Sequence, residues 1–188
     1  GNAIPKRPPG LTWTEPVDGS TPANEWLGLY ELAELPQYVN PTSGFLQNCN
    51  STPVFAAGEP GSGLEYPPDF VPELDNPRAK RSRQILTGTR KFSFEDWSRA
   101  ALDTGVYLAD REKTHLNLEF RRLQESAPER AAEIEELVRE IERWDEISRN
   151  DSVAMTLFMA CYLRRSSRTD DTPFVTLERL FLVKTELE

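Results

Sequence analysis

The uneven distribution of proline and glycine constrains the fold of this chain more than any other feature of its sequence. Residues 1–75 hold twelve of the fifteen prolines and eight of the ten glycines in a chain of 188 residues. Proline lacks an amide hydrogen and glycine loses much backbone entropy on folding, so neither favours a long helix or a central strand. The sequence therefore predicts an irregular, partly extended N-terminal third made of loops, turns and short extended pieces.

This N-terminal segment has too little regular structure to bury a hydrophobic core by itself, so we expect it to lie over a larger body. Trp13 and Trp26 are the expected anchors, and exposed aromatics in a proline-rich tail are the alternative. Residues 25–32 fit either a short helix or a short strand. Residues 54–75 predict a long loop, and loops of that length are usually functional or mobile.

The composition changes at Asn76-Pro77, where we expect a second, helical region over residues 76–188. Asn favours the cap position before a helix, and Pro favours the first helical position. The fold class is therefore mainly α with an irregular N-terminal third. Caps and apolar spacing predict helices from Pro77 to near Gly88, from Phe94 to Gly105, over Thr114–Gln124, after a cap at Ser126, after a cap at Asp151-Ser152, and over residues 174–187, where a strand is the alternative.

Two of these helices have a distinctive apolar pattern. The helix capped by Ser126 is expected to pack through one face, with charged residues in solvent, and the apolar residues at helical spacing are Ile134, Leu137, Val138, Ile141, Trp144 and Ile147. The helix after Ser152 is apolar almost all round as far as Leu163, which predicts burial on most sides.

The overall charge excludes some classes of partner. A net charge of −9 and a pI of about 4.8 argue against non-specific binding of nucleic acid. No apolar stretch is long enough for a transmembrane helix. The one basic cluster, Arg78 to Arg83, is interpreted as a solvated helix face.

Cysteine and histidine are too few for several familiar kinds of site. Cys49 and Cys161 have neither the spacing of metal ligands nor that of a disulfide framework. His115 is the only histidine, it has no nucleophile pattern beside it, and we interpret it as a surface or structural residue. A metal site built from several histidines is excluded.

Carboxamide side chains are concentrated between Gly44 and Pro53, where Gln47, Asn48 and Asn50 fall within four residues. The turn-forming pairs Asn40-Pro41 and Ser43-Gly44 precede them. In an extended backbone Asn48 and Asn50 would face the same side. One interpretation is an Asn-rich turn whose side chains bond their own backbone. The other is an oxyanion-hole donor, a neutral N–H aimed at a developing negative oxygen.

Five short pieces of sequence in residues 16–50 resemble a known family. They are Pro16-Val17-Asp18-Gly19, Glu25-Trp26-Leu27-Gly28-Leu29, Glu34-Leu35-Pro36-Gln37, Asn40-Pro41 and Gly44-Phe45-Leu46-Gln47-Asn48-Cys49-Asn50. Their order and spacing resemble the β-chain of the penicillin-acylase-like N-terminal nucleophile hydrolases, most of all the acyl-homoserine lactone and aculeacin acylases. The resemblance continues more loosely through Arg78-Ala79-Lys80-Arg81, Trp144-Asp145, Asp151-Ser152-Val153-Ala154 and Leu157-Phe158.

The resemblance implies an amide hydrolase with a serine nucleophile at the N-terminus of its β-chain. Autoproteolysis frees this serine, whose own α-amino group acts as the base. Asn50 matches the asparagine of the oxyanion hole, Asn48 would be a supporting carboxamide, and Arg81 matches an arginine near the site. The implied substrates are acyl amides with a small polar head, such as N-acyl homoserine lactones and β-lactam-type amides.

The nucleophilic serine and the strand pair that carries it in the αββα core are not found in these residues. We therefore interpret the chain as an internal β-chain fragment that is inactive alone and whose partners are the remaining α- and β-chain segments. The family implies a periplasmic or secreted location. Relatives often bind a structural Ca²⁺, but no residue here matches such a site, and no cofactor or metal is expected in the fragment.

Two alternatives of other classes stay open at this point. The helices would form a non-catalytic interaction or scaffold module if Asn48 and Asn50 bonded only backbone groups. The proline-rich segment would be a recognition tail, although it lacks a PxxP array with flanking basic residues.

Overall fold

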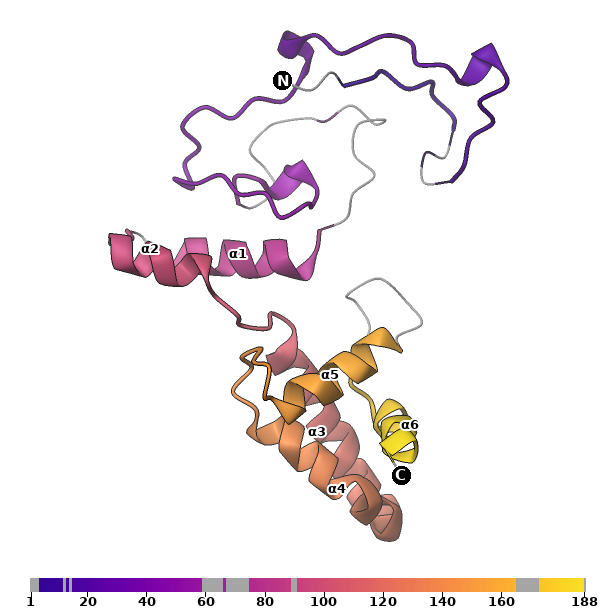
Figure 1. The fold of residues 1–188 in the computed structure, drawn as a ribbon, viewed down its shortest axis with the longest axis vertical. Coiled ribbons are helices and arrows are strands. Elements are labelled where there is room, and N and C mark those ends of the chain that lie inside the picture. The colour runs from indigo at the N-terminus through magenta and orange to yellow at the C-terminus, as the bar shows by residue number, and fades with distance from the viewer. Residues whose placement is uncertain are drawn as a thin grey trace. The chain divides into compact units, whose positions relative to one another are not determined.

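The structure is a computed structural model that describes residues 4–11, 13, 15–58, 66, 75–88, 91–164 and 173–187. The chain divides into two compact units, residues 1–93 and residues 94–188. The described residues form six α-helices and three short 3-10 helices, and their only strand pairing consists of two isolated bridges (Figure 1). The prediction of a mainly α fold with an irregular N-terminal third is confirmed.

The first unit is held by turns and by one short pairing of extended backbone. Pro5 and Leu29 form an antiparallel bridge, in which Lys6 N donates to Gly28 O at 2.9 Å and Leu27 N donates to Lys6 O at 2.8 Å. Residues 25–32 are thus neither a helix nor a full strand, because the pairing covers only one bridge. The 3-10 helices of this unit are η1 (Pro22–Asn24), η2 (Leu32–Glu34) and η3 (Pro53–Phe55).

The first unit buries few apolar side chains among its described residues, namely those of Pro8 and Ala79. Trp26 is 64% exposed, which agrees with the exposed-aromatic alternative for this residue. Trp13 is partly buried, with its indole nitrogen donating to Pro8 O at 3.4 Å. Of the loop predicted over residues 54–75, residues 59–65 and 67–74 lie outside the described residues.

Helix α1 (Pro77–Gly88) begins and ends where the sequence predicts. The Asn76 side chain caps it, because its Oδ1 accepts a hydrogen bond from Ala79 N at 3.0 Å. The change of composition at Asn76 therefore marks the start of a helix. Contacts nevertheless place α1 in the first compact unit, which extends to Ser93.

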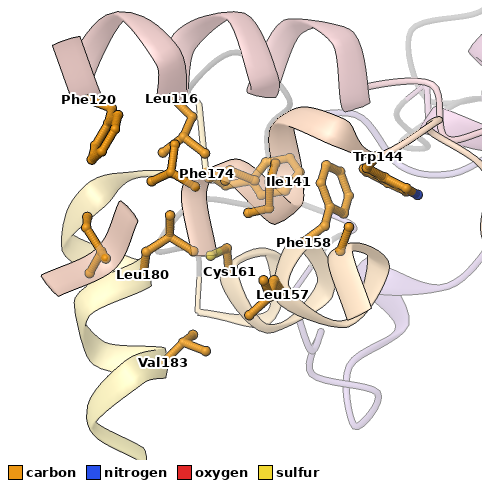
Figure 2. Packing of buried hydrophobic residues seen from close by; sticks show 14 of the residues in the cluster. Leu116, Phe120, Ile141, Trp144, Leu157, Phe158, Cys161, Phe174, Leu180 and Val183 are labelled. Carbon is orange, nitrogen blue, oxygen red and sulfur yellow. The ribbon is translucent and has the colours of Figure 1, made fainter. Parts of the chain in front are cut away.

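The second unit is a packed group of helices with its own hydrophobic core. Its packed helices are α3 (Ala109–Ser126), α4 (Pro128–Arg143), α5 (Val153–Leu163) and α6 (Leu177–Leu187). The unit begins with α2 (Phe94–Ala101), which buries no residue. Helices α3 and α4 lie side by side, and α5 and α6 pack against them (Figure 1). Figure 2 shows the core, where the Phe158 ring lies 4.9 Å from that of Phe174 and 5.3 Å from that of Trp144.

Several bounds of the predicted helices are wrong: α2 ends at Ala101 and not at Gly105, and α3 begins at Ala109 and not at Thr114. Ser126 does not cap α4: it is the last residue of α3, its hydroxyl donates to Arg122 O at 2.8 Å, and Ala127 holds the cap position without a side-chain bond. Helix α4 ends at Arg143, so Trp144 and Ile147 lie beyond it. The chain turns there because Ile147 forms an antiparallel bridge with Gly105.

Other predictions for this unit are confirmed. Ser152 caps α5, with its Oγ accepting from Met155 N at 3.1 Å. Ala154, Leu157, Phe158 and Cys161 of α5 are buried, although Leu163 is 75% exposed. Residues 177–187 are helical rather than extended.

The buried carboxylate of Glu112 fixes the segment that leads into α6. Its Oε2 accepts hydrogen bonds from Phe174 N at 2.7 Å and Val175 N at 3.0 Å, and its Oε1 accepts from Arg111 Nε at 3.0 Å. The side chain is fully buried. A buried charge persists only where it is paired and hydrogen-bonded, and Glu112 meets both conditions.

Candidate functional site

The carboxamide segment begins at a tight turn. Gly44 N donates to Pro41 O at 2.9 Å, and Gly44 has a φ of +76°, which glycine adopts without steric cost. The chain then runs extended to Gln47, whose backbone N–H donates to Ala56 O at 2.8 Å. The predicted turn at residues 40–44 is confirmed, and its exit directs the chain toward Asn48 and Asn50.

Asn48 uses its side chain locally. Its Oδ1 accepts a hydrogen bond from Asn50 N at 2.8 Å, which is the geometry of an Asx turn. The carbonyl oxygen of this carboxamide is therefore bonded to the backbone. For Asn48, the structure agrees with the interpretation of a turn residue.

Asn50 is arranged differently. Its φ of +54° lies in the left-handed region, so the backbone is not extended through Asn50. The extended geometry that would place the Asn48 and Asn50 side chains on the same side is therefore absent. The residue is exposed, and its Oδ1 accepts a hydrogen bond from the Arg78 guanidinium at 3.3 Å. Because a guanidinium only donates, the atom facing Arg78 is the oxygen. Asn50 Nδ2 has no hydrogen-bond partner in the described part of the chain, so its two N–H donors are available.

The first turn of α1 lies against this segment. Asn76 Nδ2 donates to Cys49 O at 3.0 Å and to Asn50 O at 3.1 Å, while Asn76 Oδ1 caps the helix. Arg78 follows two residues later and reaches the Asn50 side chain. Neither Asn76 nor Arg78 was predicted from the sequence as part of the site. The signal for Asn76 was its predicted cap, which places its side chain outside the helix where it contacts the preceding loop.

Arg81, the arginine matched by resemblance, lies one helical turn after Arg78. Its Nη1 donates to Gln84 Oε1 at 3.0 Å on the same helix. The guanidinium that bonds to the Asn50 carboxamide is that of Arg78. The resemblance singled out Arg81, whereas Arg78 was predicted only as part of the basic cluster.

The basic cluster from Arg78 to Arg83 was predicted to be a solvated helix face. This prediction is wrong for Arg83. Arg83 forms a two-pronged ion pair with Asp75, with N–O distances of 3.0 and 2.6 Å, and the two side chains are 13% and 15% exposed. The Arg83 guanidinium also lies 4.8 Å from the centre of the Phe55 ring. These contacts fix α1 to the segment that follows Asn50, because Phe55 belongs to η3.

A tyrosine contact lies at the other end of the carboxamide segment. The Tyr66 hydroxyl donates to Pro53 O at 3.0 Å and lies 3.4 Å from the Tyr38 hydroxyl. Burial, with the Tyr38 hydroxyl as a further cause, raises the pKa of Tyr66 above its ordinary value. Tyr66 is thus a neutral hydrogen-bond donor at neutral pH, and it has a structural role here.

His115 has the neighbours of a structural residue. Its Nε2 lies 3.8 Å from Glu119 Oε1, and its Nδ1 is buried without a hydrogen-bond partner in the described part of the chain. Neither cysteine forms a disulfide, and burial raises the pKa of the Cys161 thiol to about 11. Cys161 is therefore protonated at neutral pH, which does not favour a nucleophilic role.

The described residues contain neither a cluster of metal ligands nor a membrane-spanning helix. No three of their His, Cys, Asp and Glu side chains are grouped so that they could hold a metal ion. None of the described helices combines the length and the apolar character needed to cross a membrane. A cleft of about 400 Å³ lies in the second unit, lined in part by Leu123, Arg130 and Phe181, and no predicted site residue lines it.

Comparison with known protein families adds one match. The family model for penicillin amidase matches residues 1–184. The chain belongs to the penicillin amidase family. This penicillin amidase chain is accordingly part of an acylase-type amidohydrolase, as the sequence resemblance predicted, and acyl amides are the class of substrate. A search among curated proteins found no significant match.

Proposed function

We propose that Asn50 supplies the oxyanion-hole donor of a penicillin-amidase-type acylase. The observation that supports this is the arrangement of its carboxamide: the oxygen is bonded to Arg78 at 3.3 Å, and the exposed nitrogen has no partner among the described residues. A donor that is oriented and unoccupied is what a developing oxyanion requires. The Asn48 carboxamide has its oxygen bonded to the backbone, so we assign the donor to Asn50 and give Asn48 only a supporting role.

The reaction is acyl transfer from an amide to a serine and then to water. The nucleophile in this proposal is an N-terminal serine outside these residues, with its own α-amino group as the base. Attack of the serine oxygen on the amide carbon forms the C–O bond and moves the carbonyl electron pair onto oxygen. Asn50 Nδ2–H donates to that oxygen, and collapse of the intermediate expels the amine, which takes up the proton held by the base. Water then releases the acyl group by the same steps.

Arg78 strengthens this donor in two ways. Its hydrogen bond to Oδ1 withdraws electron density from the amide, which makes the Nδ2 hydrogens better donors. Its positive charge also lies beside the Asn50 carboxamide, and therefore near the substrate oxygen on which negative charge develops. We assign no chemical step to Arg81. That Arg81 lies near the substrate stays a prediction.

The finer identity of the enzyme is also part of this proposal. The order of the five pieces in residues 16–50 supports the acyl-homoserine lactone and aculeacin acylase branch. We infer acyl amides with a small polar head as substrates, self-cleavage of a precursor, a periplasmic or secreted location, and a structural Ca²⁺ bound by other parts of the protein. The 188-residue chain alone is expected to be inactive, and amidase turnover by the purified chain would contradict this.

The test compares two asparagines on the same segment. In the full-length acylase, Asn50→Ala is expected to lower kcat by ~10²–10³ when the rate is expressed per self-cleaved molecule. The matched variant Asn48→Ala removes one of the bonds that hold the Asn50 backbone and leaves the Asn50 carboxamide in place, so it is expected to lower kcat by roughly 10-fold at most. Equal and small effects of both substitutions would remove the oxyanion assignment and favour the non-catalytic scaffold alternative.

A further inference from the structure

We propose that Asn76 is a positioning residue for the Asn50 carboxamide, an inference that rests on the proposed function of Asn50. The Asn76 side chain is partly buried and makes hydrogen bonds in two directions. Its Oδ1 accepts from Ala79 N at 3.0 Å, and its Nδ2 donates to Cys49 O at 3.0 Å and to Asn50 O at 3.1 Å. One carboxamide thus joins the start of α1 to the backbone on both sides of the Asn50 Cα atom.

The backbone at Asn50 needs such support. A φ of +54° places a residue with a Cβ atom in a sparsely populated region, which persists only where the surroundings hold it. Asn48 Oδ1 holds the amide N–H of Asn50 at 2.8 Å. Asn76 holds the carbonyl of the preceding peptide group and that of Asn50 itself. Together these bonds fix the direction in which the Asn50 side chain leaves the backbone.

Asn76, which holds Asn50, is itself fixed to the first turn of α1. Lys80 N donates to Asn76 O at 3.0 Å, so Asn76 is joined to the first helical turn through its backbone as well as its side chain. Arg78, in the same turn, donates a hydrogen bond to the side-chain oxygen Oδ1 of Asn50. A single turn of helix therefore sets both the backbone and the side-chain orientation of Asn50.

Asn76 acts through Asn50 and contacts no reacting atom itself. An oxyanion donor contributes most in the transition state, and a small displacement of such a group costs much rate. Loss of the Asn76 donor should therefore lower kcat and leave KM nearly as it is.

The substitution that tests this role is Asn76→Asp in the full-length acylase. Asp has nearly the same shape and is an equally good helix cap, but it cannot donate to the carbonyls of Cys49 and Asn50. We expect kcat per self-cleaved molecule to fall roughly 10-fold or more, with KM within about twofold of the wild type. In an Asn50→Ala background, Asn76→Asp should lower kcat no further, because the group that it positions is gone.

Ser152→Ala is the matched control, because it removes the cap of α5 in the other unit and should leave kcat unchanged. The proposal is overturned if Asn76→Asp keeps wild-type kcat, if its effect persists in the Asn50→Ala background, or if Ser152→Ala lowers kcat as much. It is also overturned if neither Asn76→Asp nor Asn76→Ser yields self-cleaved protein, since we expect folding and cleavage to survive. If Asn50→Ala itself keeps wild-type kcat, the proposed function of Asn50 fails, and this result is distinct from the others.

Discussion

The Arg78 guanidinium donates a hydrogen bond to Asn50 Oδ1 at 3.3 Å, across 28 residues of sequence. This contact joins the first turn of α1 to the segment that carries the candidate oxyanion donor. It also decides which end of the Asn50 carboxamide is occupied, because an arginine side chain has no acceptor. The nitrogen end has no partner among the described residues, and in the proposed function it donates to the substrate oxygen.

Arg78→Ala is expected to lower kcat of the full-length acylase roughly 10-fold to 10²-fold, because the Asn50 carboxamide loses its restraint and a nearby positive charge. Steady-state kinetics of the self-cleaved enzyme measure this. Arg139→Ala removes an arginine from an exposed ion pair with Glu135 on α4 and serves as the control. Equal kinetics for Arg78→Ala and the wild type would show that the observed contact has no catalytic consequence.

The Asp75–Arg83 pair should stabilise the first unit. Both side chains are more than four-fifths buried, and removal of one partner leaves the other charged without compensation. Asp75→Ala is expected to cost about 3 kcal/mol of local stability, measured by hydrogen exchange of the α1 amides. The exposed Glu135–Arg139 pair is the reference, and Glu135→Ala should cost at most about 1 kcal/mol in α4. A similarly small cost for Asp75→Ala would mean that the pair contributes little.

Glu112 should be among the most sensitive positions of the second unit. Glu112→Ala leaves the buried backbone N–H groups of Phe174 and Val175 without an acceptor, and the expected loss is about 3 kcal/mol in the free energy of unfolding from urea titration. Glu125→Ala, at an exposed position of the same helix, is the matched control and should change stability by about 0.5 kcal/mol or less. A loss at Glu112 no larger than that at Glu125 would contradict the role given to this carboxylate.

Titration of the Asp145 carboxyl should make the stability of the fold depend on pH. Its hydrogen bond from Arg149, at 2.6 Å, is the main cause that holds the pKa of this carboxyl below its ordinary value of 3.8. A folded-state pKa below the unfolded one stabilises the fold at pH values above 3.8, and this contribution is lost as the pH falls through the folded-state pKa. The difference in unfolding free energy between the wild type and Asp145→Asn should therefore shrink from about pH 6 toward about pH 2. A difference that stays constant over this range would rule out Asp145 as the titrating group.

The sequence predicted most of the helices because helix caps and apolar spacing act within a few residues along the chain. Asn76 and Ser152 cap helices as expected, since a short polar side chain before an apolar repeat satisfies the free N–H groups of the first turn. Ser126 misled because α3 runs on to it, and its hydroxyl bonds back to Arg122 instead. Trp144 has helical spacing but leaves the helix, because Ile147 pairs with Gly105.

The rest depends on contacts between distant parts of the chain. Glu112 lies in a charged run typical of a helix surface, and its partners lie 62 and 63 residues later. At the candidate site, the resemblance predicted Asn50 and Arg81, whereas Arg78 and Arg83 were predicted only as members of one basic cluster. Their different roles follow from the register that the Asn76 cap gives to α1, so that Arg78 contacts Asn50 while Arg83 contacts Asp75.

The affinity of a transition-state analogue for the self-cleaved acylase, with and without Asn50, reports on the oxyanion donor itself. An alkyl boronic acid forms a tetrahedral adduct with a serine oxygen and places an oxygen where the oxyanion would lie. If Asn50 donates to that oxygen, Asn50→Ala should weaken the inhibitor by ~10²–10³ and lower kcat/KM by the same factor. Unchanged inhibitor affinity in self-cleaved Asn50→Ala protein would contradict the central claim that Asn50 is the oxyanion donor.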